Sequence, residues 1–167
     1  MKFLKLISFI ILAICLNSCS VYNFTGAKPV DAKTFQVNFF QNNAELIEPG
    51  IERKFTIKLQ DIIQNQTNLD LVSSGGDLLY EGEIVEYRIS PTTATSDNRA
   101  AQNRLTISVQ VRFYDKNDPE GEVDQRFSFF YDYPGDQQLI GSSLTSALDV
   151  IFERITQDIF NESLAKW

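Results

Sequence analysis

The chain has 167 residues and carries 15 Lys and Arg against 22 Asp and Glu, which gives a net charge of −7 at pH 7. This acidic balance opposes binding to nucleic acid, whose phosphates attract basic surfaces. The sequence has no histidine, which excludes Ser-His-Asp and Cys-His nucleophile systems and histidine-bound metals, so we expect no enzymatic activity and no cofactor.

The first 18 residues have the three parts of a secretory signal peptide. Lys2 and Lys5 give a positive start, residues 6–16 form an apolar run, and the small-residue site Leu-Asn-Ser precedes Cys19. The run is shorter than the roughly 18 to 20 residues that a spanning helix needs, so a retained transmembrane anchor is the weaker interpretation. We therefore expect cleavage directly before Cys19.

The sequence around Cys19 resembles the lipobox of bacterial lipoproteins, because Leu-x-Ser-Cys ends the apolar run. Asn17 departs from the small or aliphatic residue usual at its position. The resemblance implies lipid on the Cys19 sulfur and then on the new amino terminus. Since each buried CH₂ contributes about 0.8 kcal/mol, two or three acyl chains anchor a protein stably without a spanning segment. An ordinary signal peptide that leaves a free cysteine is the alternative.

Cleavage would leave residues 19–167, which are 149 residues and suit one domain with a sizeable core. Loss of Lys2 and Lys5 leaves 13 basic side chains against 22 acidic ones, a net charge of −9. Cys15 departs with the signal peptide, so the mature chain forms no internal disulfide. We expect a lipidated tether over 19–30 and a single domain over 31–167.

The first regular patterns of the mature chain predict a strand and then a helix. Residues 35–39 alternate between apolar and polar side chains, as in a half-buried strand, until Gln41-Asn42-Asn43 ends the pattern. Pro49 suits the first turn of a helix that we expect to end near Asn65. The apolar stripe of this helix recurs at spacings of three and four residues and consists of Ile51, Phe55, Leu59, Ile62 and Ile63.

A short strand over 69–71 follows, and residues 73–77 have strong turn chemistry, so we expect a hairpin into the next strand. The alternation of that strand, from Leu78 to Ile89, slips by one residue near Ile84, which predicts a β-bulge. Residues 91–102 are polar and show neither a helical nor a strand pattern.

Two strands and a helix complete the chain. Residues 104–113 alternate without interruption, and after a turn at 115–121 the alternation resumes over 123–131, so these strands should pair antiparallel. From Ile140 to Ile159, apolar residues recur at helical spacing and predict an amphipathic helix.

The order of elements predicts an α+β fold, a two-layer sandwich of two helices on one face of a four- or five-stranded, mainly antiparallel sheet. The apolar stripes of the helices and the apolar faces of the strands require each other for burial. We interpret the helix stripes as core and not as a surface for lipid or a cofactor.

The mature sequence resembles the LptE family, the lipopolysaccharide-assembly lipoproteins of the Gram-negative outer membrane. The similarity is carried by the order and spacing of several short motifs, none of which is diagnostic alone. They are Tyr22-Asn23-Phe24-Thr25-Gly26, Asn42-Asn43-Ala44, Gln66-Thr67 with Leu69, Gly75-Gly76-Asp77-Leu78, Gly82, Tyr87, Asn103-Arg104-Leu105-Thr106, and Asp158-Ile159-Phe160-Asn161 with Trp167.

The resemblance implies an outer-membrane protein that sits as a plug in the LptD β-barrel, assists assembly of that barrel and helps deliver lipopolysaccharide to the outer leaflet. A polar strand face, as over residues 104–112, would suit the polar lumen of a barrel. Arginines there could bind lipid A phosphates through their planar, two-donor fork, although for each arginine alone a solvated strand residue is the stronger interpretation. The candidate ligand-binding residues are Arg88, Arg99, Arg104, Arg112 and Arg126.

Two other classes of protein fit the sequence. One is a periplasmic lipoprotein that carries a small apolar ligand between helices and sheet without a barrel partner. The other is a carboxylate-dependent hydrolase, which would need clustered carboxylates of raised pKa in a cleft.

Overall fold

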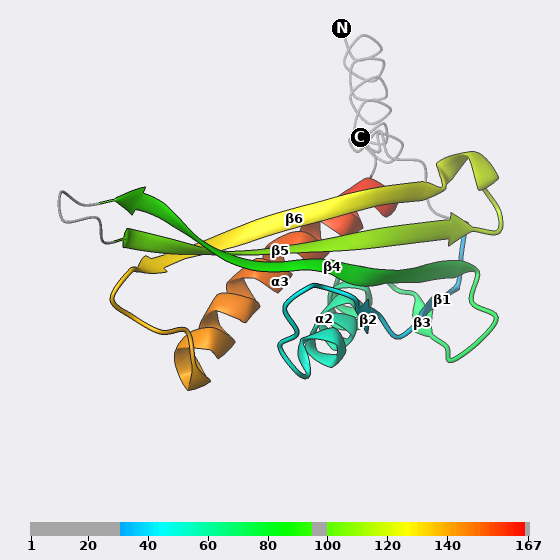
Figure 1. Cartoon of the computed structure of the whole chain (residues 1–167). Helices are drawn as coiled ribbons and strands as arrows, with labels where there is room; N and C mark the ends of the chain where they lie inside the picture. Colours follow the sequence, from blue (N-terminus) through cyan, green and yellow to red (C-terminus); the bar gives the residue numbers. More distant parts are fainter. Residues whose placement is uncertain (1–30, 95–99, 166–167) are drawn as a thin grey trace, which may run out of the picture.

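A computed structural model describes residues 31–94 and 100–165 of the chain (Figure 1). The predicted signal peptide, Cys19, the tether and Arg99 lie outside these residues. The helices and strands, in chain order, are β1 (Thr34–Val37), β2 (Gln41–Asn42), α2 (Ile51–Gln66), β3 (Asp70–Leu71), β4 (Leu78–Ala94), β5 (Ala100–Asp115), the 3-10 turn η2 (Pro119–Gly121), β6 (Val123–Pro134) and α3 (Gly141–Ser163).

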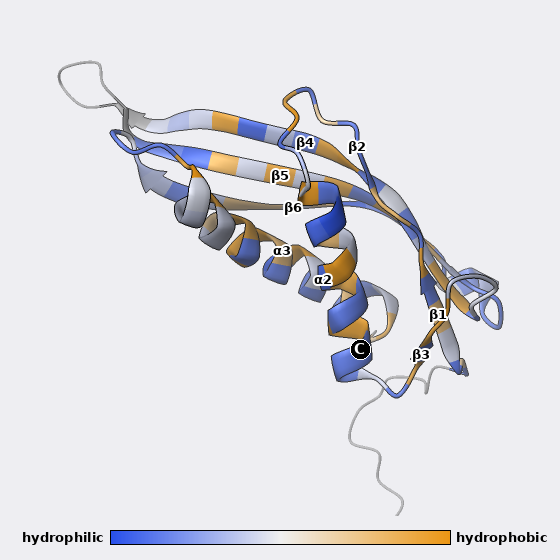
Figure 2. Ribbon diagram, turned by 90° about the horizontal axis from the view of Figure 1, so that it is seen from below, coloured by the Kyte–Doolittle hydropathy of each residue, from blue (hydrophilic) through white to orange (hydrophobic). Residues whose placement is uncertain are grey.

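The described strands form one mixed sheet of six strands in the order β3-β1-β4-β5-β6, in which β2 also pairs with β4. The long strands β4, β5 and β6 run antiparallel, whereas β1 and β2 run parallel to β4 and β3 runs parallel to β1. Both helices lie on the same face of this sheet (Figures 1 and 2). The predicted two-layer α+β fold is confirmed, but the sheet has more strands and more parallel pairing than expected. Strands of two residues, such as β2 and β3, are too short to show an alternating pattern.

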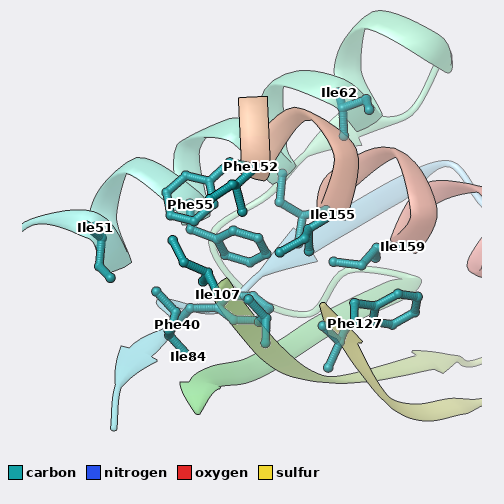
Figure 3. Close-up of a cluster of buried hydrophobic side chains, with 14 of the residues drawn as sticks. Phe40, Ile51, Phe55, Ile62, Ile84, Ile107, Phe127, Phe152, Ile155 and Ile159 are labelled. Carbon is teal, nitrogen blue, oxygen red and sulfur yellow. The ribbon is translucent and has the colours of Figure 1, made fainter. Parts of the chain in front are cut away.

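The core lies between the sheet and the two helices. The inward side chains of β5 are almost completely buried, which confirms the alternation predicted there. Phe55 of α2 packs edge-on against Phe40 and Phe152, with ring centroids 5.0 Å and 5.3 Å apart (Figure 3). Such aromatic contacts hold the two helices and the β1–β2 segment together around one centre.

The predicted bulge is present in β4. Ile84 pairs with Val109 of β5, whereas the next pairing joins Glu86 to Ser108, so Val85 is the extra residue. The bulge brings Ile84 and Tyr87 to the same buried face of the sheet. Without it, one half of β4 would direct its apolar side chains to solvent.

The described residues of the segment 91–102, for which the sequence shows no strand pattern, are in strands. β4 continues to Ala94 and β5 begins at Ala100, with irregular pairing around Pro91 and Thr93. Backbone pairing between the two strands extends beyond the region where apolar side chains reveal it, which explains the difference.

The expected hairpin at 73–77 is wrong. β3 and β4 lie on opposite sides of β1 and both run parallel to it, so residues 72–77 carry the chain across β1. A Cβ at Gly76 would lie 2.7 Å from the backbone nitrogen of Gln36 and 2.9 Å from the carbonyl carbon of Phe35. The crossing therefore requires glycine at this position, because two backbones meet there.

Asp77 ends this crossing and holds the start of β1. Its carboxylate accepts hydrogen bonds from the backbone N–H groups of Lys33, at 2.9 Å, and Thr34, at 3.0 Å. The Thr34 hydroxyl accepts one from the backbone N–H of Asp77. These bonds, that from Lys33 first, lower the pKa of Asp77 below its ordinary value of 3.8.

We predict that Gly76→Ala lowers the free energy of unfolding by about 1–3 kcal/mol, because the added methyl overpacks against the β1 backbone. Urea unfolding followed by circular dichroism measures the change. Ser74→Ala, an exposed position in the same crossing, should stay within about 0.5 kcal/mol of the wild type. Equal effects of both variants would show that the crossing is not as tight as described.

Acid should weaken the hydrogen bonds by which Asp77 holds Lys33 and Thr34, which we call the Asp77 clamp. Because the folded pKa lies below 3.8, the contribution of Asp77 is complete above that pH and is lost as the pH falls through the folded pKa. We predict that Asp77→Asn lowers the urea midpoint at neutral pH, and that its midpoint falls less than the wild-type midpoint on acidification. Asp61→Asn, which removes an exposed charge from α2, is the control. If the urea midpoint of Asp77→Asn fell with pH as steeply as the wild-type midpoint, the Asp77 clamp would be contradicted.

Candidate functional site

The face of β4, β5 and β6 that carries no helix is mostly polar, with Phe130 as an exposed aromatic side chain, and we call it the open face. Cross-strand pairing places its side chains in rows across the three strands. The open face consists of Glu81, Glu83, Glu86, Arg88 and Ser90 on β4, Arg104, Thr106, Ser108, Gln110 and Arg112 on β5, and Asp124, Arg126, Ser128, Phe130 and Asp132 on β6.

Glu86 is the centre of this face. Its carboxylate accepts hydrogen bonds from Arg88 Nε at 2.8 Å, from Ser108 Oγ at 2.7 Å and from Arg126. Ser108 Oγ also lies 3.0 Å from Ser128 Oγ, so the network crosses all three strands. The Arg88 hydrogen bond, followed by those from Ser108 and Arg126, lowers the pKa of Glu86 and keeps it ionised at neutral pH.

A second ion pair joins Arg104 of β5 to Asp132 of β6. The guanidinium donates through Nε at 2.7 Å and through Nη2 at 2.8 Å, one bond to each carboxylate oxygen. The same guanidinium stacks 3.6 Å from the ring centre of Phe130. The bond from Arg104 lowers the pKa of Asp132, and the carboxylate in turn raises the pKa of Arg104. Stacking and bidentate pairing together orient this arginine firmly.

The other end of the open face repeats this chemistry. Arg112 Nε donates to Glu81 at 3.1 Å, and the Gln110 amide donates to Asp124 at 2.6 Å. Glu83 accepts a hydrogen bond from the side chain of Asn43, which follows β2. Charges along the face are therefore paired with opposite charges, mostly across strands, and are not gathered by sign.

Four of the five arginines predicted to bind ligand, Arg88, Arg104, Arg112 and Arg126, lie on the open face, and the fifth, Arg99, is outside the described residues. Each of the four forms an ion pair with a carboxylate. Arg104 and Arg112 are eight residues apart on β5, a distance of about 27 Å along a strand. The structure thus distributes these arginines over a nearly neutral face and does not gather them into one basic patch.

Sequence patterns did not reveal the acidic partners of these arginines. Glu81 and Asp132 lie on strands next to those of their arginines, and Glu86 lies two strands away from Arg126, so only the pairing register assigns these partners. Arg88 and Glu86, in contrast, are two residues apart on β4. The alternation of β4 and β6 predicts that these acidic residues lie on the open face. It does not predict which residues lie opposite one another, because the bulge and the two turns determine the register.

Buried apolar side chains from the sheet and both helices meet in the core of the described sandwich (Figure 3), an arrangement that favours a packed core over the internal cavity of a carrier. A pocket of ≈ 320 Å³ opens at the surface, where Ala32, Thr67 and Leu164 meet.

Among the described carboxylates whose pKa shifts, namely Asp77, Glu86 and Asp132, every shift is downward. This does not favour the hydrolase, which needs a protonated acid near neutral pH. Neither described helix has both the length and the hydrophobicity to cross a bilayer.

The model of the LptE family, described as lipopolysaccharide-assembly, matches residues 32–163. The chain belongs to the LptE family. The matched range includes the whole open face and both helices and leaves out the predicted lipobox. No curated protein matches the chain.

Solved structures similar to this LptE-family chain confirm its fold. An uncharacterized lipoprotein B from Nitrosomonas europaea has 16% identity and a TM-score of 0.51 over 78% of this chain and 81% of that one. A hypothetical protein from Chlamydia trachomatis has 11% identity and a TM-score of 0.54, covering 81% and 98%. A protein from Xanthomonas campestris has 8% identity and a TM-score of 0.53, covering 82% and 88%. At such identities the similarity concerns the fold alone.

We predict that the Arg104–Asp132 pair stabilises the β5–β6 pairing. Arg104→Glu should lower the melting temperature, because it places two carboxylates opposite each other. The double variant Arg104→Glu with Asp132→Arg should recover most of the loss, since it restores an ion pair. Differential scanning calorimetry measures both. Failure of the double variant to recover would assign the loss to the Phe130 stacking.

Proposed function

We propose that this LptE-family protein is an outer-membrane lipoprotein that sits in the lumen of the LptD β-barrel, assists assembly of that barrel and helps deliver lipopolysaccharide to the outer leaflet. The observation that carries this proposal is the open face, a long polar surface whose charges are paired within the protein itself. The lumen of a large barrel is polar as well.

A nearly neutral polar face suits such a partner. A surface with strong charge of one sign would attract or repel a barrel wall without selectivity. Paired side chains with unused donors and acceptors can instead form hydrogen bonds over a wide area. Arg112, for example, uses Nε toward Glu81, and its guanidinium has further N–H groups. The proposed mechanism is thus binding and scaffolding, without bond chemistry.

The proposal includes lipidation at Cys19 after removal of residues 1–18. The tether over 19–30 has 12 residues and reaches at most about 40 Å when fully extended. A protein held at that distance by its lipid lies within reach of a barrel in the same membrane. The domain over 31–167 would then lie on the periplasmic side of the outer membrane or inside the barrel lumen.

The described arginines of the open face remain candidates for lipopolysaccharide contact. A lipid A phosphate could bind the N–H groups that the carboxylates leave unused, and Arg104 is held in position for this by Phe130. We include glycolipid binding at Arg88, Arg104, Arg112 and Arg126 in the proposal, together with Arg99, which lies outside the described residues.

Purification of the tagged full chain from its own outer membrane tests the barrel partner. We predict that a large barrel co-purifies, identified by mass spectrometry and by heat-modifiable migration. Cys19→Ala should reduce its recovery, because the lipid brings the two proteins into one membrane. Recovery of the protein without a barrel, carrying a small apolar ligand, would contradict the proposal and favour the carrier.

The glycolipid contact has its own test. Arg104→Gln with Arg112→Gln should weaken binding of purified lipopolysaccharide about tenfold, the effect of losing about 1.4 kcal/mol. Arg53→Gln, an exposed arginine of α2 on the helix side, is the matched control. If the double variant and the control bind alike, and the barrel still co-purifies, the arginines have no part in glycolipid recognition.

A further inference from the structure

One edge of the described sheet is a long strand. β6 has 12 residues and pairs only with β5 within the described residues. An edge strand presents unpaired backbone N–H and C=O groups, which form a template for a further strand.

A groove runs beside this edge. One wall consists of four consecutive residues of β6, Gln125 to Ser128, and the other consists of Asp158, Asn161 and Glu162 of α3 with Ala165, which follows that helix. Since consecutive residues of one strand line it, the backbone edge itself forms the wall. A groove between an edge strand and a helix is the arrangement in which extended peptides add to a sheet.

The described chain begins at one end of this groove. The carbonyl of Asp31 accepts a hydrogen bond from the Asn117 side chain, in the connection between β5 and β6. Ala32 lines the same surface pocket as Phe160 and Leu164, directly before the groove residue Ala165. Residues before 31 therefore start where β6 starts and can run along it in the opposite direction.

The sequence immediately before contains a segment suited to a strand. Residues 21–25, Val-Tyr-Asn-Phe-Thr, are mostly β-branched or aromatic and precede Gly26. Tyr22 and Phe24 would lie on one face, and Asn23 on the other. The groove also has an apolar side and a polar side, because Phe127 is buried toward the helices while Ser128 lies on the open face.

We propose that residues 21–25 pair antiparallel with β6 as an additional edge strand, with Tyr22 and Phe24 against Phe127 and Ala165 and with Asn23 on the open face. The five residues 26–30 span up to about 17 Å, while the two steps from Val123 to Gln125 along β6 take about 7 Å. The connection is therefore long enough.

The same chain is a better occupant than a second copy. Two copies joined through β6 would bring their α3 walls together, and each wall carries Asp158 and Glu162. Residues 21–25 carry no charge. If Cys19 is lipidated, as the proposed function requires, docking of this segment places the lipid two residues beyond the groove and turns the β6 edge toward the membrane. The pairing itself does not depend on that function.

Engineered disulfides test the register and the occupant. In the purified mature lipoprotein, without any barrel, Asn23→Cys combined with Arg126→Cys or Ser128→Cys should form a disulfide within one chain under mild oxidation. Asn23→Cys with Thr106→Cys, in the middle of the open face, should not. Disulfides between two chains, or equal yields at all positions, would overturn the proposal.

Hydrogen exchange of the unmodified mature protein gives an independent readout that needs no variant to fold. We expect amides in 22–25 to exchange at least about tenfold more slowly than in an unstructured peptide. Asn23→Pro should abolish this protection, because proline removes a donor and disrupts pairing, whereas Ala27→Pro in the connection should retain it. Peptide-like exchange over 22–25 in the wild type would overturn the proposal, whether or not a barrel partner exists.

Discussion

The structure depends on the burial of two helix stripes against a single face of one sheet. Leu105, Ile107 and Val109 all point to that face, and Phe55 of α2 and Phe152 of α3 close the core from the other side. Since β5 and β6 alternate without a bulge, each apolar side chain that points inward has neighbours in the chain that point outward. The polar open face is thus a direct consequence of how the core is made.

The open face meets this requirement by pairing its charges with one another, mostly across strands. The bulge at Val85 matters here, because it puts Glu86 opposite Ser108 and within reach of Arg126. A face satisfied in this way stays solvated and stable alone, and it offers hydrogen bonds, not hydrophobic area, to a partner. Because of this property, the proposed function places this member of a lipopolysaccharide-assembly family in a polar barrel lumen.

The long patterns of the sequence predicted much of this fold. The alternation over 104–113, both helix stripes and the slip near Ile84 correspond to β5, the two helices and the bulge. The parallel pairing of β1 with β3 and β4 was not predictable, because strands of two residues show no period and a Gly-Gly turn fits a hairpin equally well. For the site, the arginines were found but their acidic partners were not, since alternation assigns a face and says nothing about which strands are neighbours.

Site-specific photo-crosslinking in living cells tests the central claim, that the open face is the surface that meets the barrel. A photoreactive residue at Thr106, in the middle of the open face, is compared with one at Gln64, which is exposed on α2 on the helix side. We predict a strong crosslink from position 106 to a protein of barrel size, identified by mass spectrometry, and a weaker one from position 64. A crosslink from position 64 with none from position 106 would contradict the account.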